Sequence, residues 1–171
     1  TKLGIKKFVF YSTVAVYGNH KEYTTEETSP EPASSYGESK LAAEGRVYWW
    51  VSENPIRQAV IIRPAVVFGP ENYANMYNLI NSLYKKRFLF IGRGDNIKSV
   101  AYVENLVEAT VFLLERMRPG VDIYNYSDYP QMTIEQIVKT ITDYLPCNMP
   151  RLKIPLKPAM AAASIFDIIG K

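Results

Sequence analysis

The chain has 171 residues, of which 47% are hydrophobic and 22% are charged, a balance typical of globular rather than disordered proteins. Lys and Arg number 20 against 17 Asp and Glu, and a net charge of +3 is too small to indicate a nucleic-acid partner. A single cysteine and a single histidine exclude a disulfide framework and a Cys/His metal site, so we expect no metal and a cytoplasmic protein. No apolar run reaches the length of a membrane span.

Both ends of the sequence predict a cut through a larger protein. A strand-like run at 7–11 starts almost at once with no initiator Met before it, and residues 164–171 stop within or just after a helix-like pattern. We therefore expect an N-terminal half that this sequence lacks.

Apolar runs alternate with amphipathic segments along the chain, which is typical of an α/β fold with a mainly parallel sheet. In chain order we expect a buried strand at 8–12, a polar loop at 19–34, a helix at 35–52 capped by Ser35, a strand at 58–63 that Pro64 ends, a helix at 75–86, strands at 88–91 and 98–102, a helix at 103–117, a strand at 121–126, a helix at 133–145 capped by Thr133, and an extended piece at 151–156.

A tyrosine and a lysine stand four residues apart just inside the first of these helices. At that spacing Tyr36 and Lys40 share one helix face. A nearby ammonium favours the phenolate form of a tyrosine, so the pair can exchange a proton with a substrate hydroxyl near neutral pH. Because the same spacing also occurs between unrelated helix residues, the neighbouring segments decide its meaning.

Polar residues end the two strands that flank this helix. Ser12 and Thr13 follow the first strand, and Arg63 and Pro64 close the second. The carboxyl ends of parallel strands are where open α/β sheets bind ligands. We therefore expect the strand ends and the helix start to form one proton-handling site.

Together these segments resemble the extended short-chain dehydrogenase/reductase family, of the NAD-dependent epimerase/dehydratase type. The resemblance runs from about residue 5 to about residue 145 and rests on V-Y-G at 16–18, Y-x-x-x-K at 36–40 with A-A-E at 42–44, R-P-x-x-V-x-G-P at 63–70, V-x-N-x-x-x-A at 103–109 and Y-N at 124–125. It implies a partial Rossmann-like, doubly wound fold. Residues 1–70 would be the C-terminal half of the dinucleotide-binding domain, and 71–171 mostly a small α/β substrate-binding subdomain, with a strand and helix returning near 98–127.

The resemblance also implies roles for individual residues. Tyr36 is the catalytic acid/base, and Lys40 assists it and holds the nicotinamide ribose of NAD or NADP. Thr13, five residues before the glycine of V-Y-G, hydrogen-bonds the reacting oxygen, with Ser12 as the second choice. The resemblance further implies that Pro64, Ala65 and Val66 contact the nicotinamide, and that Lys98 and Arg93 bind substrate.

Four departures from the family pattern limit which family properties can be assigned to this chain. Val14 and Ala15 stand where dehydratases carry Asp-Glu, which disfavours water elimination. Lys98 stands where an Arg commonly holds a phosphate, and Lys offers a point charge rather than a bidentate fork. Asn105 replaces a common Asp. The N-terminal Gly-rich phosphate loop has no counterpart, so this segment alone is expected to bind dinucleotide poorly and to be inactive.

The leading functional hypothesis is an NAD(P)-dependent epimerase of a nucleotide sugar, and the family implies a homodimer formed through the Tyr36–Lys40 helix. A reductase or dehydrogenase of a non-sugar alcohol is the alternative, because Lys98 departs from the sugar-nucleotide pattern. A non-catalytic cofactor-sensing protein is the third, and the Tyr-Lys pair counts against it. The choice between NAD and NADP stays open, because the segment that normally sets it is absent.

Overall fold

The computed structural model describes residues 4–20, 23–150 and 152–155, so the helix-like pattern expected at 164–171 lies outside the described residues. The chain divides into two compact units: Thr1–Gly69 with Val100–Asp128, and Pro70–Ser99 with Tyr129–Lys171. The first unit is therefore made from two separate stretches of sequence.

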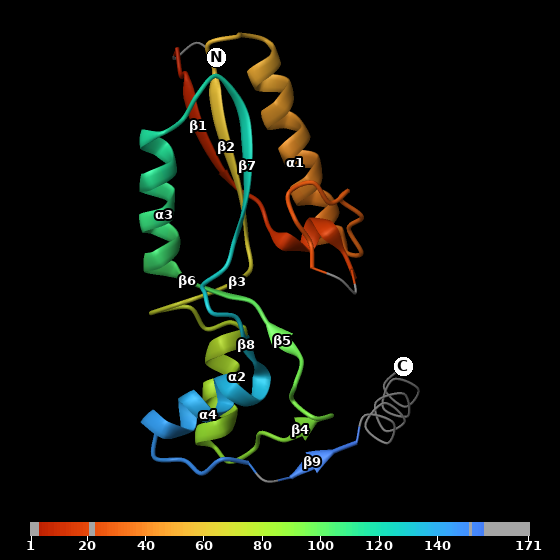
Figure 1. Ribbon diagram of the computed structural model, residues 1–171, viewed down its shortest axis with the longest axis vertical. Coiled ribbons are helices and arrows are strands. Elements are labelled where there is room, and N and C mark those ends of the chain that lie inside the picture. Colours follow the sequence, from red (N-terminus) through yellow and green to blue (C-terminus); the bar gives the residue numbers. More distant parts are fainter. Residues whose placement is uncertain (1–3, 21–22, 151, 156–171) are drawn as a thin grey trace. The chain divides into compact units, whose positions relative to one another are not determined.

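Helices and strands alternate along the chain (Figure 1), as the sequence predicts. The elements are β1 (Lys7–Tyr11), the short 3-10 helix η1 (Val14–Tyr17), α1 (Ser35–Ser52), β2 (Gln58–Pro64), β3 (Val66–Phe68), α2 (Asn75–Tyr84), β4 (Phe90–Ile91), β5 (Ile97–Lys98), β6 (Val100–Tyr102), α3 (Val103–Glu115), β7 (Gly120–Tyr126), β8 (Met132–Thr133), α4 (Ile134–Tyr144) and β9 (Lys153–Ile154).

The first unit is built around a three-stranded parallel sheet in the order β1–β2–β7. Successive side chains of a strand point to opposite faces. Ala59 and Ile61 of the central strand pack against α1, whereas Val60 and Ile62 pack, together with Leu106, on the face that α3 covers. Helices on both faces (Figure 1) explain the uninterrupted apolar run of β2, and the predicted α/β class is confirmed.

β1 forms one edge of this sheet and is less buried than its apolar run predicts. It pairs with β2 from Lys7 opposite Gln58 to Tyr11 opposite Ile62. Phe8 and Tyr11 are 43% and 41% exposed, because no strand among the described residues pairs with the other side of β1. The apolar run therefore predicts the strand but not its place at an edge.

Side-chain hydroxyls cap two of the α-helices among the described residues. Ser34, rather than the predicted Ser35, caps α1: its Oγ accepts a hydrogen bond from the Gly37 N–H at 3.2 Å. The backbone of Ser34 is extended, as a capping residue requires, whereas Ser35 is already helical. At α4 the predicted cap is confirmed, and Thr133 forms a reciprocal capping box with Gln136.

Several predicted strand ends differ from the structure. β2 does not stop before Pro64 but includes it as its last residue, in register opposite Tyr126. The strand expected at 98–102 is two short strands: β5 pairs antiparallel with β8, and β6 pairs parallel with β3. Pairing with different partners separates segments that a continuous pattern joins.

The second unit packs α2 and α4 around a core of Leu83, Phe90 and Val138. Its strands are two-residue pairs, β4 with β9 and β5 with β8. No helix among the described residues is both long and apolar enough to cross a membrane.

Asp128 follows β7 and holds the start of α3. Its Oδ2 accepts a hydrogen bond from the Tyr102 N–H at 2.7 Å, and its Oδ1 accepts from the Asn105 amide and the Tyr126 hydroxyl, each at 3.2 Å. Burial, followed by the nearby Asp128 charge, raises the pKa of Tyr126. The amide of Asn105 thus serves as a donor to a carboxylate, a role that an unprotonated Asp could not fill.

Replacing Asn105 with Asp tests this arrangement. Asn105→Asp places a second carboxylate beside Asp128, and we expect a loss of about 1 kcal/mol or less at neutral pH because the site is exposed. Repulsion raises the pKa of one carboxylate in the folded state, so the deficit relative to wild type should shrink as the pH falls below that raised value. Thermal unfolding between pH 7 and pH 4 measures it.

Asn105→Ala is the matched control, because it removes the same hydrogen bond without adding charge. Its deficit should depend less on pH than that of Asn105→Asp, because no second carboxylate is added. Equal pH dependence of the two variants would contradict repulsion between the two carboxylates.

Candidate active site

The carboxyl ends of β1 and β2 lie at the same edge of the parallel sheet. The Ser12 N–H donates to the Ile62 carbonyl at 2.7 Å, which extends the pairing of β1 past Tyr11. The Ala65 N–H donates to the Tyr126 carbonyl at 2.8 Å, which does the same for β2. This edge is where open α/β sheets bind ligands, and α1 begins after the loop that follows η1.

Lys40 connects α1 to the end of β1. Its Nζ donates to the Tyr11 carbonyl at 2.9 Å and lies 5.2 Å from the centre of the Phe10 ring and 6.0 Å from that of Tyr36. Tyr36 is 56% exposed, so its phenol is accessible. The structure therefore brings the ammonium between the tyrosine ring and the strand end.

The two hydroxyls after β1 have different surroundings. Thr13 caps η1, and its Oγ1 accepts a hydrogen bond from the Ala15 N–H at 3.2 Å. Because a hydroxyl can accept and donate at once, its proton remains available for a substrate oxygen. Ser12 is 4% exposed, and its Oγ has no hydrogen-bond partner among the described residues.

Gly18 lets the chain pass close to the loop that precedes α1. Its φ of +71° favours glycine, and a side chain there would overlap the carbonyl oxygen of Glu31. The same loop is held at the end of β7, where the Asn125 N–H donates to Glu26 Oε1 at 2.6 Å. The glycine of V-Y-G thus allows the loop to bring Tyr36 back to the sheet edge.

A buried polar network lies beside these groups and was not assigned a role from the sequence. Arg63 binds the Glu44 carboxylate with both Nε, at 2.9 Å, and Nη2, at 2.6 Å. Its Nη1 donates at 2.7 Å to the Tyr17 hydroxyl, which in turn donates to Asn125 Oδ1 at 2.8 Å. The network joins β2, α1, η1 and β7.

The charges of this network are stabilised by each other rather than by water. Arg63 is 3% exposed and Glu44 and Tyr17 are each 2% exposed. Burial opposes the positive charge of Arg63, but the hydrogen bonds and attraction from Glu44 and then Tyr17 outweigh it and raise the pKa of Arg63 above its usual value. The sequence feature that could have indicated this buried network is an arginine that directly follows an apolar run.

The predicted substrate-binding residues belong to the second compact unit. Lys98 lies in β5 opposite Met132 and is half-buried. Arg93 is exposed in the turn after β4, and its carbonyl accepts a hydrogen bond from Lys153 Nζ at 2.9 Å. The proton-handling candidates and these cations are thus carried by different units.

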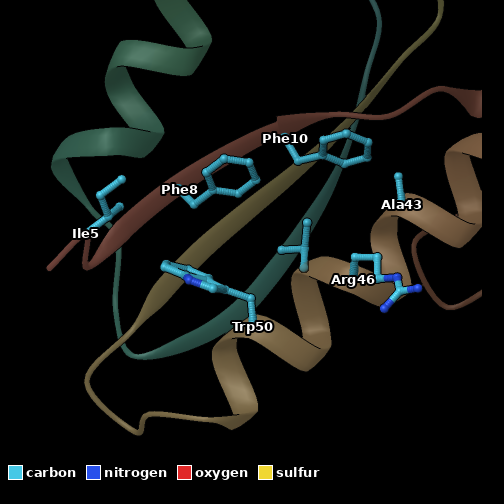
Figure 2. A pocket seen from close by; sticks show the side chains of 7 residues that line it. Ile5, Phe8, Phe10, Ala43, Arg46 and Trp50 are labelled. Carbon is cyan, nitrogen blue, oxygen red and sulfur yellow. The ribbon is translucent and has the colours of Figure 1, made fainter. Parts of the chain in front are cut away.

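An apolar recess of about 340 Å³ lies between β1 and α1 (Figure 2). Phe8 and Trp50 meet across it with ring centres 5.9 Å apart, and Arg46 borders it. The recess contains no hydroxyl or carboxylate among its lining residues, so it lacks the groups that proton transfer needs.

The groups at the sheet edge fit a nicotinamide nucleotide. A ribose offers hydroxyls that an ammonium and a phenol can bind, and the buried, unpartnered Ser12 Oγ can serve a polar atom brought to this edge. A parallel α/β sheet with a Tyr and a Lys four residues apart on the helix after β1, and a Ser-Thr pair at that strand's end, defines the extended short-chain dehydrogenase/reductase class.

The chain belongs to the NAD dependent epimerase/dehydratase family, whose model matches residues 1–126. NAD is the cofactor of that family. An Escherichia coli O157:H7 protein, N-acetyl-alpha-D-glucosaminyl-diphospho-ditrans,octacis-undecaprenol 4-epimerase, is 37% identical over 99% of this chain and 52% of its own length. Human dTDP-D-glucose 4,6-dehydratase is 33% identical over 80% of this chain and 40% of its own length.

Solved structures show the same fold. A UDP-N-acetylglucosamine 4-epimerase from Methanobrevibacter ruminantium, in complex with UDP-N-acetylmuramic acid, matches with a TM-score of 0.73 and 25% identity over 88% of this chain and 50% of that one. The chain spans about half the length, or less, of the relatives named here. The Rossmann-like class predicted from the sequence is confirmed.

Gly37 lies where α1 closely approaches the backbone of η1. A Cβ at this position would lie 2.6 Å from the Ala15 carbonyl oxygen and 3.0 Å from Pro32 Cβ. We expect Gly37→Ala to push the start of α1 away from η1 and to lower the free energy of unfolding by about 1–3 kcal/mol. Chemical denaturation measures the loss.

Gly45 in the same helix is the matched control, because a Cβ there meets nothing within 4 Å. Gly45→Ala should be neutral or should stabilise the protein by up to about 1 kcal/mol, since alanine favours a helix. A Gly37→Ala variant as stable as Gly45→Ala would show that the close approach is not rigid.

Proposed function

We propose that the protein carrying this chain is an NAD(P)-dependent epimerase of a nucleotide sugar. The single observation that carries the proposal is the position of the Lys40 ammonium. It lies beside the Tyr36 ring and binds the end of β1, where Thr13 offers a hydroxyl. These are the groups that deprotonation and reprotonation of a sugar hydroxyl require.

Each residue has a defined task in this proposal. Tyr36 removes the proton of a sugar hydroxyl, while Thr13 donates a hydrogen bond to the same oxygen as it becomes a carbonyl. Lys40 places its ammonium 6.0 Å from the centre of the Tyr36 ring and binds the nicotinamide ribose. When bound, the nicotinamide supplies a hydride acceptor and then a hydride donor.

The reaction balances without a second co-reactant. The keto sugar would rotate in the site so that its opposite face meets the nicotinamide, which would supply the hydride it had accepted, and Tyr36 would return its proton to the oxygen. The configuration at that carbon is inverted, and no net oxidation occurs. The backbone at Pro64, Ala65 and Val66 is the proposed contact for the nicotinamide end, with Ser12 beside it.

Dehydration is disfavoured despite the likeness to dTDP-glucose dehydratases. Water elimination needs an acid and a base beside the reacting carbons, and the two residues that follow Thr13 are Val14 and Ala15. Neither side chain can transfer a proton. The residues at the end of β1 therefore favour epimerisation over the dehydratase reaction.

Lys98 and Arg93 are the proposed cations for the diphosphate of the substrate. The M. ruminantium relative carries a UDP-sugar in its structure, whereas the E. coli relative is named for a sugar on a polyprenyl diphosphate. Both substrates share a sugar diphosphate, so a polyprenyl-linked sugar is the second candidate. A panel with UDP-N-acetylglucosamine and its undecaprenyl-diphosphate counterpart separates the two.

Replacing the phenol of Tyr36 tests the proposed acid/base directly. In the intact protein, Tyr36→Phe should lower the epimerisation rate by about 10²–10⁴-fold, the usual contribution of a positioned acid or base. Conversion of a nucleotide sugar to its epimer, followed by NMR, measures the rate. Tyr144→Phe is the control, because Tyr144 is 84% exposed and lies at the end of α4 in the other unit.

The cofactor balance distinguishes an epimerase from the reductase alternative. An epimerase interconverts its sugars with no net change in NAD(P)H, whereas a reductase or dehydrogenase changes NAD(P)H in proportion to product. Such proportional change would overturn the epimerase proposal, and a near-normal rate in Tyr36→Phe would remove the phenol from the mechanism.

We also propose a homodimer through the outer face of α1. Trp49 and Tyr48 on this helix are 58% and 47% exposed, and large exposed aromatic side chains are enriched at protein interfaces. Light scattering at micromolar concentration should show a dimer that Trp49→Glu converts to a monomer, while Tyr144→Glu leaves it intact. A monomeric wild-type protein would contradict the proposal.

A further inference from the structure

We propose that Glu44, Arg63 and Tyr17 are positioning residues that hold the acid/base helix and the end of β1 in one fixed geometry. This inference rests on the proposed function, because it concerns how Tyr36, Lys40 and Thr13 are aligned. None of the three residues is proposed to touch substrate. They act through the elements that carry the reacting groups.

The first step concerns one face of α1. Tyr36, Lys40 and Glu44 follow each other at intervals of four residues, so they lie along the same side of the helix. Lys40 is bound to the carbonyl of Tyr11 in β1, and one turn later Glu44 is bound to Arg63 in β2. Two anchors on one face fix both the rotation and the height of α1 against the sheet.

The second step concerns η1, which follows Thr13. Tyr17 in η1 accepts a hydrogen bond from the same guanidinium at 2.7 Å, and the guanidinium carbon lies 4.9 Å from the centre of its ring. The planar fork of arginine presents its donors in fixed directions. A movement of α1 that turned Arg63 would therefore also displace η1 and the nearby Thr13.

The third step concerns energy. Replacing a buried ion pair with apolar residues of similar volume is often neutral or stabilising, so stability alone does not explain why a pair is present here. A directional pair in which all three guanidinium nitrogens donate a hydrogen bond does specify one arrangement of the elements that it joins. Arg63 also immediately precedes Pro64, where the proposed nicotinamide contact begins. The Glu44–Arg63 pair therefore also holds the backbone of that contact in place.

The test compares variants that remove the network without leaving a charge buried alone. The double variant Glu44→Leu with Arg63→Met replaces the pair by apolar groups, and Tyr17→Phe removes one hydroxyl while keeping its ring. Val47→Ala is the control, because it opens a cavity in the same helix without touching the network. All are made in the intact protein and compared by thermal unfolding.

In both network variants we expect kcat to fall by at least about 10-fold with KM within about twofold, since misplacement by 1 Å can cost about 100-fold in rate. In Val47→Ala, kcat should stay within about twofold of wild type. A loss of kcat in Val47→Ala equal to that in the network variants at matched stability, or no loss in the network variants, would overturn the inference.

A spectroscopic readout separates this inference from the proposed function. With 3-fluorotyrosine at position 36, the ¹⁹F resonance should shift or broaden in the network variants and remain unchanged in Val47→Ala. If the wild-type protein epimerises no nucleotide sugar, the proposed function fails, while the resonance still decides whether the network positions Tyr36. An unchanged resonance in the folded double variant would refute positioning.

Discussion

The buried ion pair between Glu44 and Arg63 is the interaction on which the geometry of the first unit depends. Taking both charges out of water has a large cost, which two hydrogen bonds to the carboxylate and a third to Tyr17 offset. If one charge lost its partner, the other would destabilise the fold by about 3–5 kcal/mol. The pair is therefore an all-or-none constraint, and it joins a helix, two strands and the turn after β1.

The sequence predicts well those features that depend on neighbouring residues. The apolar run of β2, the four-residue spacing of Tyr36 and Lys40 and the capping box at Thr133 are local patterns with local physical causes, and each element formed where it was expected. The prediction of Ser35 as the cap of this helix was wrong, because the adjacent Ser34 can cap it equally well and only the backbone conformation decides between them.

Features that depend on distant partners could not be predicted in the same way. The run at 98–102 divides because β5 and β6 pair with different strands, and β1 is exposed because it lies at an edge. The motifs that carry the family resemblance include Tyr17, Glu44, Arg63 and Asn125. Nothing in the spacing of these residues indicates that their side chains meet. A charged residue directly after an apolar run does require a partner, and that rule would have pointed to Arg63.

The departures from the family pattern acquire different physical meanings in the structure. Val14 and Ala15 remove proton-transfer groups at the end of β1, which affects the chemistry that this edge can perform. Asn105 instead donates to Asp128 and affects how α3 is held. A substitution at a motif position thus bears on the proposed reaction type in one case and on the contacts of a helix in the other.

The division into two units separates chemistry from substrate choice in the proposed enzyme. Tyr36, Lys40 and Thr13 belong to the unit that the buried network holds together, whereas Lys98 and Arg93 belong to the unit with small strands and an independent core. Changes at Lys98 or Arg93 would not disturb the ion pair or the helix face that it orients. The proton-transfer groups can therefore stay constant while the diphosphate carrier of the sugar varies, which is consistent with relatives named for nucleotide-linked and polyprenyl-linked sugars.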